Sequence, residues 1–167
     1  MGYSHCWKIL HTAPYELPDS TYHAIERELV GAWDAGVIQY EHDNADPPVI
    51  RPEKIRFNGI GDEAHETFLF KLAPDAEWVY KPDDARVFDS CKTGRDRYDF
   101  IVCVTLALLK DGLGDSVVIH TDGDGPGSDD DEWTPVQSYL RDHYGIDIRV
   151  SSSGELSTGR ILEEAYV

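Results

Sequence analysis

The sequence predicts an α+β fold with one mostly antiparallel sheet and about three helices packed on one face. Two observations favour this class. Apolar residues alternate in several short segments and recur at helical spacing in others. Hairpin-like pairs dominate the first half of the chain, and no Gly-x-Gly-x-x-Gly motif follows a predicted strand, which argues against a doubly wound parallel sheet.

The chain has 167 residues, a length typical of one domain, and its 41% hydrophobic residues suffice for a buried core. We therefore expect a single domain over residues 1–167, with a weakly patterned tail over 151–167. No internal repeat is visible.

The first predicted element is a strand over Tyr3–Thr12, where β-favouring residues alternate. A helix follows, because Pro18, Asp19 and Ser20 are typical of a helix start and Gly36 of a helix end. Between them runs one apolar stripe that consists of Tyr22, Ile25, Leu29 and Trp33.

The middle of the chain is predicted to form short strands. The prolines within 44–52 predict an irregular connection. A long turn joins two of the strands, which should pair as a hairpin. The expected strands are Val37–Glu41, Lys54–Asn58 and Glu66–Leu72 (the hairpin pair), and Trp78–Tyr80.

The stretch Val87–Lys110 combines an apolar run, a basic loop and the most hydrophobic segment of the chain, Phe100–Leu109. We interpret it as strand, loop and buried helix, with Asp96 or Asp99 as the helix cap and Gly112 as its stop. Cations and backbone N–H groups at a helix start favour a bound anion.

The last third is predicted to begin with a core strand and to continue with an acidic, glycine-rich loop over 122–132. A third helix and a short strand follow, and the tail could dock through Ile161, Leu162 and Tyr166. The expected elements are the strand Ser116–Thr121, the helix Pro135–His143, capped by Thr134 or its neighbour and ended by Gly145, and the strand Ile146–Val150.

The charge balance is extreme, with 32 acidic against 15 basic residues and a net charge of -17. Carboxylates are spread along the whole chain and Lys is scarcer than Arg, which favours a surface adapted to a salt-rich cytosol. At ~1 M salt the Debye length is only about 3 Å, so self-repulsion is screened. The charge argues against binding to a nucleic-acid duplex. A nucleic-acid mimic remains an alternative.

The sequence predicts a soluble, cytoplasmic protein, because it shows no leader and its longest strongly apolar run is far shorter than a membrane span. We expect no membrane partner. Cys6, Cys91 and Cys103 are widely spaced and form no Cys-x-x-Cys pair, which favours free buried thiols over disulfides or a zinc site.

Three short motifs fail on inspection. Lys92-Thr93 lacks the glycine-rich run of a P-loop, and His65-Glu66 lacks the second histidine of a zinc protease motif. In the loop over 122–132, a calcium-loop alignment puts Pro126 and Trp133 at ligand positions, so we interpret it as a solvated loop. We predict no metal and no cofactor.

The remaining candidate is an anion site formed by Lys92, Thr93 and Arg95. Its pocket would be closed by Tyr3, His5 and Tyr98. The competing interpretation is that these cations simply pair with neighbouring carboxylates. Those carboxylates are Asp89, Asp96 and Asp99.

The sequence does not decide whether the protein is an enzyme. Proton-handling candidates are His5, Glu66 and Asp122, and phosphate hydrolysis or transfer by His5 or Glu66 would be the reaction class that fits best.

Four segments resemble a family of small phage, prophage and bacterial proteins of no known activity, whose members open with Gly-Tyr-Thr-His-Tyr-Trp. The segments are Gly2 to Trp7, Ile55 to Gly59 with Glu66 to Phe68, Cys91 to Thr93 with Arg95, Tyr98 and Asp99, and Thr121 to Asp124 with Trp133. The likeness spans roughly residues 2–145. Cys6 replaces an aromatic residue of the pattern, and the acidic insertion before Trp133 and the tail after Ser151 also depart from it.

The sequence therefore predicts an accessory protein, viral or mobile-element related and from a high-salt host, that binds a small anionic ligand such as a nucleotide or phosphate ester. If it is viral, it would act in the host cytoplasm. The alternative is a non-catalytic module that binds another protein through its acidic surface, as a virion component or as an inhibitor of a host factor.

Overall fold

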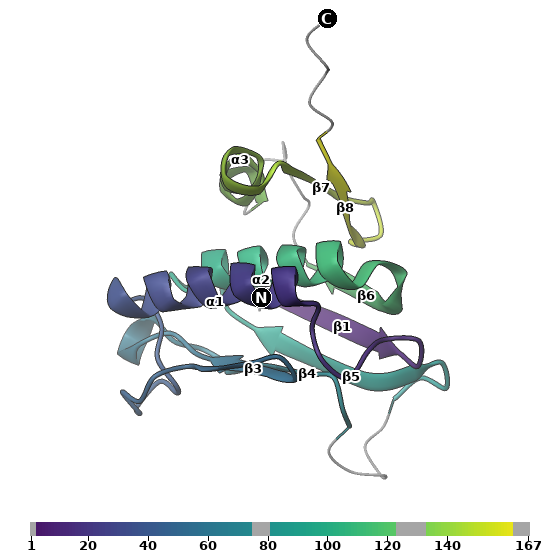
Figure 1. The fold of residues 1–167 in the computed structure, drawn as a ribbon. Helices are drawn as coiled ribbons and strands as arrows, with labels where there is room; N and C mark the ends of the chain where they lie inside the picture. The colour runs from purple at the N-terminus through teal and green to yellow at the C-terminus, as the bar shows by residue number, and fades with distance from the viewer. Residues whose placement is uncertain (1–2, 75–80, 123–132, 162–167) are drawn as a thin grey trace, which may run out of the picture.

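The computed structural model describes residues 3–74, 81–122 and 133–161. These residues form an α+β fold of helices and antiparallel strands, as expected (Figure 1). The helices are α1 (Asp19–Asp34), α2 (Asp99–Leu113) and α3 (Trp133–Tyr144), with 3-10 turns η1 (Gly61–Glu63) and η2 (Gly114–Ser116). The strands are β1 (Ser4–Leu10), β2 (Val49–Arg51), β3 (Lys54–Phe57), β4 (Phe68–Lys71), β5 (Ala85–Lys92), β6 (Val117–Thr121), β7 (Ile146–Val150) and β8 (Leu156–Arg160).

The expectation of one sheet was wrong: the described strands form three. Their orders are β5-β1-β6, β2-β3-β4 and β7-β8, and every pairing is antiparallel. The expected hairpin with a long loop is confirmed as β3 and β4.

The elements lie in layers around α2 (Figure 1). The sheets of β1 and β3 lie below α1 and α2, and α3 with β7 and β8 lies above them. Because α2 is covered from both sides, every residue from Ile101 to Leu109 is buried, which accounts for the apolar run predicted as a buried helix. No helix of the described residues is long and apolar enough to cross a membrane.

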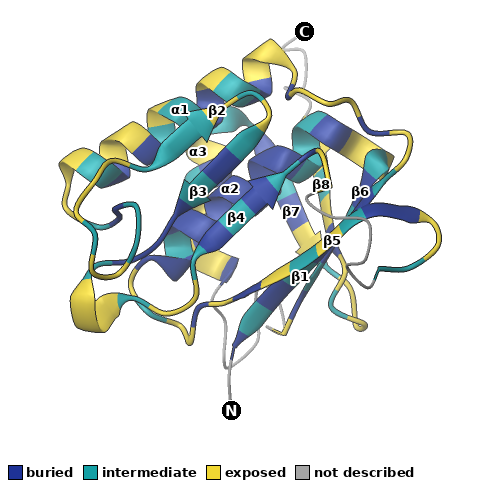
Figure 2. Ribbon diagram, turned by 90° about the horizontal axis from the view of Figure 1, so that it is seen from below, coloured by how far each residue is buried: buried dark blue, intermediate teal, exposed yellow. Residues whose placement is uncertain are grey.

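Aromatic side chains form the core between the lower sheets and the helices. The Trp7 ring lies 5.1 Å from that of Phe68, which in turn lies 5.0 Å from that of Phe57. All three are at most 1% exposed. Figure 2 shows the alternation of buried and less buried positions along β3 and β4. These contacts join β1 to the β2-β3-β4 sheet.

The end of α1 agrees with the prediction, and the end of α2 differs from it. Helix α1 ends before Gly36, whose φ of 72° is the left-handed conformation expected after a helix. Helix α2 continues past Gly112, which was predicted to end it. Gly112 lies against Thr21 of α1, and a left-handed glycine, Gly114, follows the helix instead.

Several short elements differ from the prediction. Residues 37–41 form only isolated bridges, such as Gln39 with Asn58, and β2 lies inside the segment expected to be irregular. Helix α3 begins at Trp133, so Thr134 is within it and is not its cap. The strands expected around Lys54, Ser116 and Ile146 are confirmed. Residues 78–80 and most of the acidic loop lie outside the described residues.

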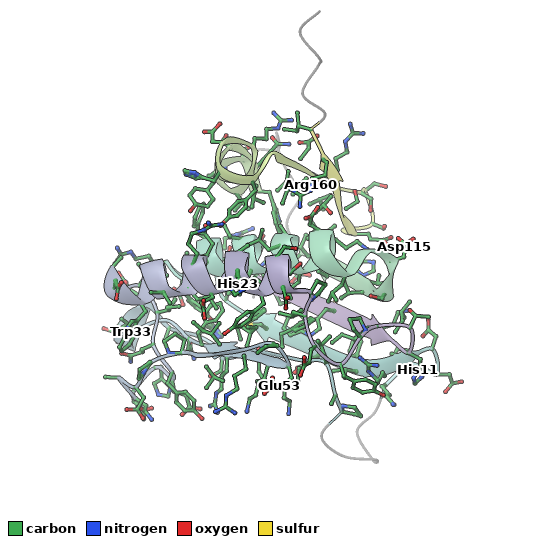
Figure 3. The ribbon with its side chains drawn as sticks, viewed as in Figure 1. His11, His23, Trp33, Glu53, Asp115 and Arg160 are labelled. Atoms are coloured by element: carbon green, nitrogen blue, oxygen red, sulfur yellow. The ribbon has the colours of Figure 1, made fainter. Side chains whose placement is uncertain are left out.

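The predicted tail contains strand β8, which pairs with β7. Arg160 connects this hairpin to the body of the molecule (Figure 3): its guanidinium donates to Asp111 of α2 at 2.5 Å and to the carbonyl oxygen of Tyr144 at 3.1 Å. Ile161 is 46% exposed, and residues 162–167 lie outside the described part of the chain.

Candidate functional site

The first residues of β1 lie between the ends of β5 and β6, and this arrangement brings most of the predicted site residues together. Ser4 is paired with Lys92, and His5 is paired with Cys91 on one side and Thr121 on the other. The antiparallel register therefore places Tyr3 and His5 beside the basic turn that follows β5 and beside Asp122, which follows β6.

The turn after β5 wraps around the carbonyl oxygen of Tyr3. The backbone N–H groups of Thr93 and Gly94 donate to that oxygen at 3.0 and 3.2 Å. Arg95 follows with φ of 61°, and among the described residues it is the one non-glycine with positive φ. A left-handed conformation costs an L-residue roughly 1–2 kcal/mol, so the surrounding contacts must hold it.

Arg95 lies over the ring of Tyr3, with 4.9 Å between its guanidinium carbon and the ring centroid. The Tyr3 ring in turn meets the His5 ring edge-on, with centroids 5.0 Å apart. The three side chains form a stack from the surface to the interior, because Arg95 is exposed, Tyr3 is 3% exposed and His5 is fully buried.

Below this stack, the buried carboxylate of Asp99 has several hydrogen-bonding neighbours. His5 Nε2 lies 2.8 Å from Asp99 Oδ1, and the Thr93 hydroxyl donates to the same oxygen at 2.7 Å. The Cys103 sulfur lies 3.6 Å from Asp99 Oδ2. The prediction that Asp99 could cap α2 is therefore wrong. Asp99 is the first helical residue, and its carboxylate points inward to these donors.

The two carboxylates proposed as proton handlers are both held by backbone N–H groups. Glu66 Oε2 accepts the Lys92 N–H at 2.7 Å, and Asp122 Oδ2 accepts the Ser4 N–H at 3.1 Å and the Ser4 hydroxyl at 2.7 Å. Both side chains are exposed, on either side of β1. They flank the basic turn without lying in a shared cavity that the described residues define.

Thr93 and Tyr98 face the interior, and so do Tyr3 and His5. The Thr93 hydroxyl is committed to Asp99, and the Tyr98 hydroxyl donates to the carbonyl oxygen of Glu66 at 2.7 Å. Burial raises the pKa of Tyr98 well above its usual range, and it raises the pKa of the neighbouring Cys91 thiol to about 12. Thr93 and Tyr98 thus support the turn, and a surface ligand would meet the exposed Lys92 and Arg95 first.

The pairing of Lys92 and Arg95 with Asp89, Asp96 and Asp99 stays an alternative prediction, on which the contacts of Asp99 bear most directly. Asp99 serves His5 and Thr93 instead, and Asp89 accepts the N–H of Ser90. Arg97 lies 3.8 Å from Glu63, and both side chains are 57% exposed.

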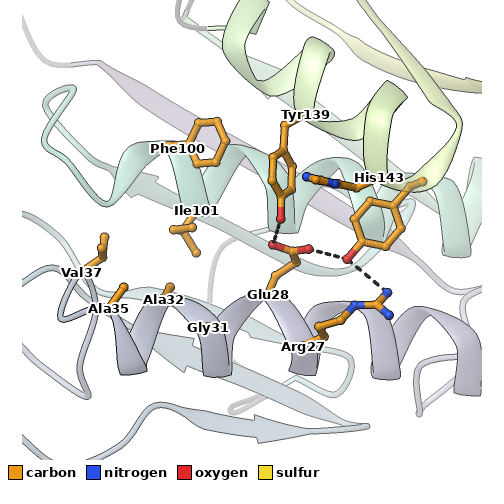
Figure 4. A pocket seen from close by; sticks show the side chains of 11 residues that line it. Arg27, Glu28, Gly31, Ala32, Ala35, Val37, Phe100, Ile101, Tyr139 and His143 are labelled. Carbon is orange, nitrogen blue, oxygen red and sulfur yellow. Dashed lines mark hydrogen bonds between the residues drawn. The ribbon is translucent and has the colours of Figure 1, made fainter.

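Sequence reasoning missed a groove of about 560 Å³ between α1 and α3 (Figure 4). None of the predicted site residues lines it. Its walls carry a polar chain: Tyr139 donates to Glu28 at 2.7 Å, Tyr144 donates to the other oxygen of Glu28, and Arg27 donates to Tyr144 at 3.3 Å. Burial, with the contact to Glu28, raises the pKa of Tyr139. These polar groups are hydrogen-bonded to one another, so this series of hydrogen bonds links α1 to α3.

Comparisons of the chain with family models, curated proteins and solved structures found no match. The resemblance to the phage and bacterial family therefore stays a prediction, and the candidate site has to be judged on its own geometry.

Proposed function

We propose that the chain binds a small anionic ligand, such as a nucleotide or another phosphate ester, at the turn Lys92–Arg95. The observation that supports this most is the position of Arg95, held in a left-handed conformation with its guanidinium over the Tyr3 ring. Stacking on an aromatic face orients a guanidinium, and a guanidinium is suited to bidentate hydrogen bonds with phosphate.

The contacts divide the residues of the turn by role. The N–H groups of Thr93 and Gly94 already donate to Tyr3, so the side chains of Lys92 and Arg95 would carry the ligand contacts. Tyr3 would orient Arg95, and Thr93 and Asp99 would hold the base of the turn. His5 is fully buried, so it would support Tyr3 without touching a ligand at the surface.

The chain as a whole is strongly acidic, with a net charge of -17. A high-salt host would explain this charge, because salt screens repulsion between exposed carboxylates. An anionic ligand would then rely on short-range hydrogen bonds to Arg95 and Lys92 more than on long-range attraction.

Calorimetric titration with pyrophosphate and a panel of nucleotides tests the proposal. A charge-assisted hydrogen bond contributes roughly 1.5–3 kcal/mol, so Arg95→Ala and Lys92→Ala should each weaken binding by about tenfold or more. Arg51→Ala is the matched control, because Arg51 is an exposed cation on β2. Absence of binding across the panel, or an equal loss in Arg51→Ala, would contradict the proposal.

The predicted alternative, a module that binds another protein through its acidic surface, has a different outcome. Co-purification of a basic partner, with no response to any anion in the panel, would favour it.

A further inference from the structure

The core holds three residues of metal-ligand types, none of which would touch the proposed anion. His5 comes from β1, and Asp99 and Cys103 come from successive turns of α2. One ligand atom from each lies within 4.8 Å of the others. All three residues are at most 4% exposed. Imidazole, carboxylate and thiolate are the ligands that zinc takes in proteins.

The distances between these atoms are close to those of a tetrahedral site. Zinc bonds of about 2.0–2.3 Å place neighbouring N, O and S ligands roughly 3.3–3.7 Å apart. The Cys103 sulfur lies 3.7 Å from His5 Nε2 and 3.6 Å from Asp99 Oδ2. The other carboxylate oxygen, Asp99 Oδ1, lies 2.8 Å from His5 Nε2 in a hydrogen bond, and this distance would have to lengthen by about half an ångström if Oδ1 bound the ion.

The charges also fit a divalent cation. A Cys103 thiolate and the Asp99 carboxylate carry two negative charges, and a neutral imidazole adds none, so a bound divalent ion makes the buried group neutral overall. Without the ion, the cluster buries a carboxylate that depends on hydrogen bonds alone.

We propose that His5, Asp99 and Cys103 bind one zinc-like divalent cation that ties β1 to α2. The second oxygen of Asp99 or a water completes the four ligands. Thr93 donates to Asp99 at 2.7 Å and keeps the carboxylate oriented, as outer-shell groups do. The metal ligands differ from Lys92 and Arg95, the side chains proposed to contact the anion, because they lie beneath Tyr3 and not at the surface.

Binding requires two proton changes. The Cys103 thiol loses its proton to solvent as the sulfur bonds the metal. An ionised Asp99 can only accept, so His5 Nε2 carries a proton in the metal-free form, and that proton must move to Nδ1 to free the lone pair of Nε2. Nδ1 has no hydrogen-bond partner among the described residues, so no existing contact of that atom opposes the change.

Metal analysis of the full chain tests the site. The protein is incubated with Zn²⁺ or Co²⁺, washed with a weak chelator and passed through a desalting column. We expect about one equivalent of metal and, with Co²⁺, a thiolate-to-cobalt charge-transfer band. Cys103→Ser should lose both. Cys6→Ser should keep both, because the Cys6 side chain lies on the other face of β1 from His5 and is only half-buried.

Wild-type protein provides the measurement that does not depend on a variant folding. Its unfolding midpoint should rise with Zn²⁺ and return to the metal-free value with EDTA. Wild-type protein without the charge-transfer band would overturn the proposal. Retention of the metal by folded Cys103→Ser would also overturn it, since the metal would then lie on surface carboxylates.

Discussion

His5 Nε2 lies 2.8 Å from Asp99 Oδ1, and the two residues are 0% and 4% exposed. This contact joins the N-terminal strand to the first turn of α2, across 94 positions of sequence. It lies beneath both the Tyr3–Arg95 stack and the basic turn, so the geometry of the proposed anion site depends on it.

Removing the carboxylate should destabilise the fold strongly. Asp99→Ala leaves the Thr93 hydroxyl and His5 Nε2 without their shared acceptor in a buried place, which we expect to cost about 3 kcal/mol or more. Urea unfolding of the metal-free protein measures the change. Asp84→Ala, which breaks the exposed pair with Lys8, should cost far less. Equal effects of the two substitutions would show that the buried contact is not a main support.

The same substitution at two helical glycines should act with opposite sign. A Cβ at Gly112 would lie 2.0 Å from Thr21 Oγ1, so Gly112→Ala forces α1 and α2 apart and should cost roughly 1–3 kcal/mol. At Gly31 of α1 a Cβ meets nothing within 4 Å, so Gly31→Ala should stabilise by about 0.5–1 kcal/mol. Thermal unfolding distinguishes them, and stabilisation by Gly112→Ala would refute the close helix packing.

Stability should fall at alkaline pH through Tyr139. Its pKa is raised in the folded state by burial and by Glu28, so its contribution is complete below the unfolded pKa of about 10 and is lost as the pH rises from there through the folded pKa. Urea midpoints at about pH 9 and about pH 11 measure the loss. Tyr139→Phe should reduce it, whereas Tyr15→Phe, at a residue 63% exposed, should not.

Salt should stabilise the protein if its acidity reflects a high-salt host. Raising KCl from ~0.1 M to ~1 M shortens the Debye length from about 10 Å to about 3 Å and screens the net charge of -17. We expect the unfolding midpoint to rise by several degrees at neutral pH. The rise should shrink near the isoelectric point of about 4.5, where the net charge is small. A midpoint that stays flat with salt would count against the high-salt interpretation.

The sequence was most informative where one segment carries its own pattern. Alternation in β1, helical spacing in α1 and the apolar run of α2 each predicted an element that the structure contains. Strand β8 was not predicted because Leu156 is its one buried residue, so the second strand of this hairpin shows no alternation of apolar and polar residues. Strand β2 lies among prolines, which favour loops.

The candidate site was predictable only where its residues are close in sequence. Lys92 and Arg95 stand out as exposed cations of one turn, but nothing local places Asp99 against His5. A signal did exist: Tyr3, His5, Trp7 and Ile9 share the buried face of β1, so His5 is a polar residue that needs an interior partner. Asp99 and Cys103, four apart on α2, lie on one face of that helix and could supply it.

The groove between α1 and α3 was not predictable from local pattern, because it depends on the placement of α3. Glu28 and Tyr139 are ordinary polar residues in sequence, and only the tertiary packing joins them.

The most direct test of anion binding is a titration of ¹⁵N-labelled protein with pyrophosphate, followed by amide chemical shifts. We predict that the largest shifts fall on residues 92–97 and on Tyr3 and Ser4, that they saturate, and that Arg95→Ala abolishes them. Unchanged amides in this turn, or shifts confined to the α1 and α3 residues that line the groove, would contradict a site at Arg95.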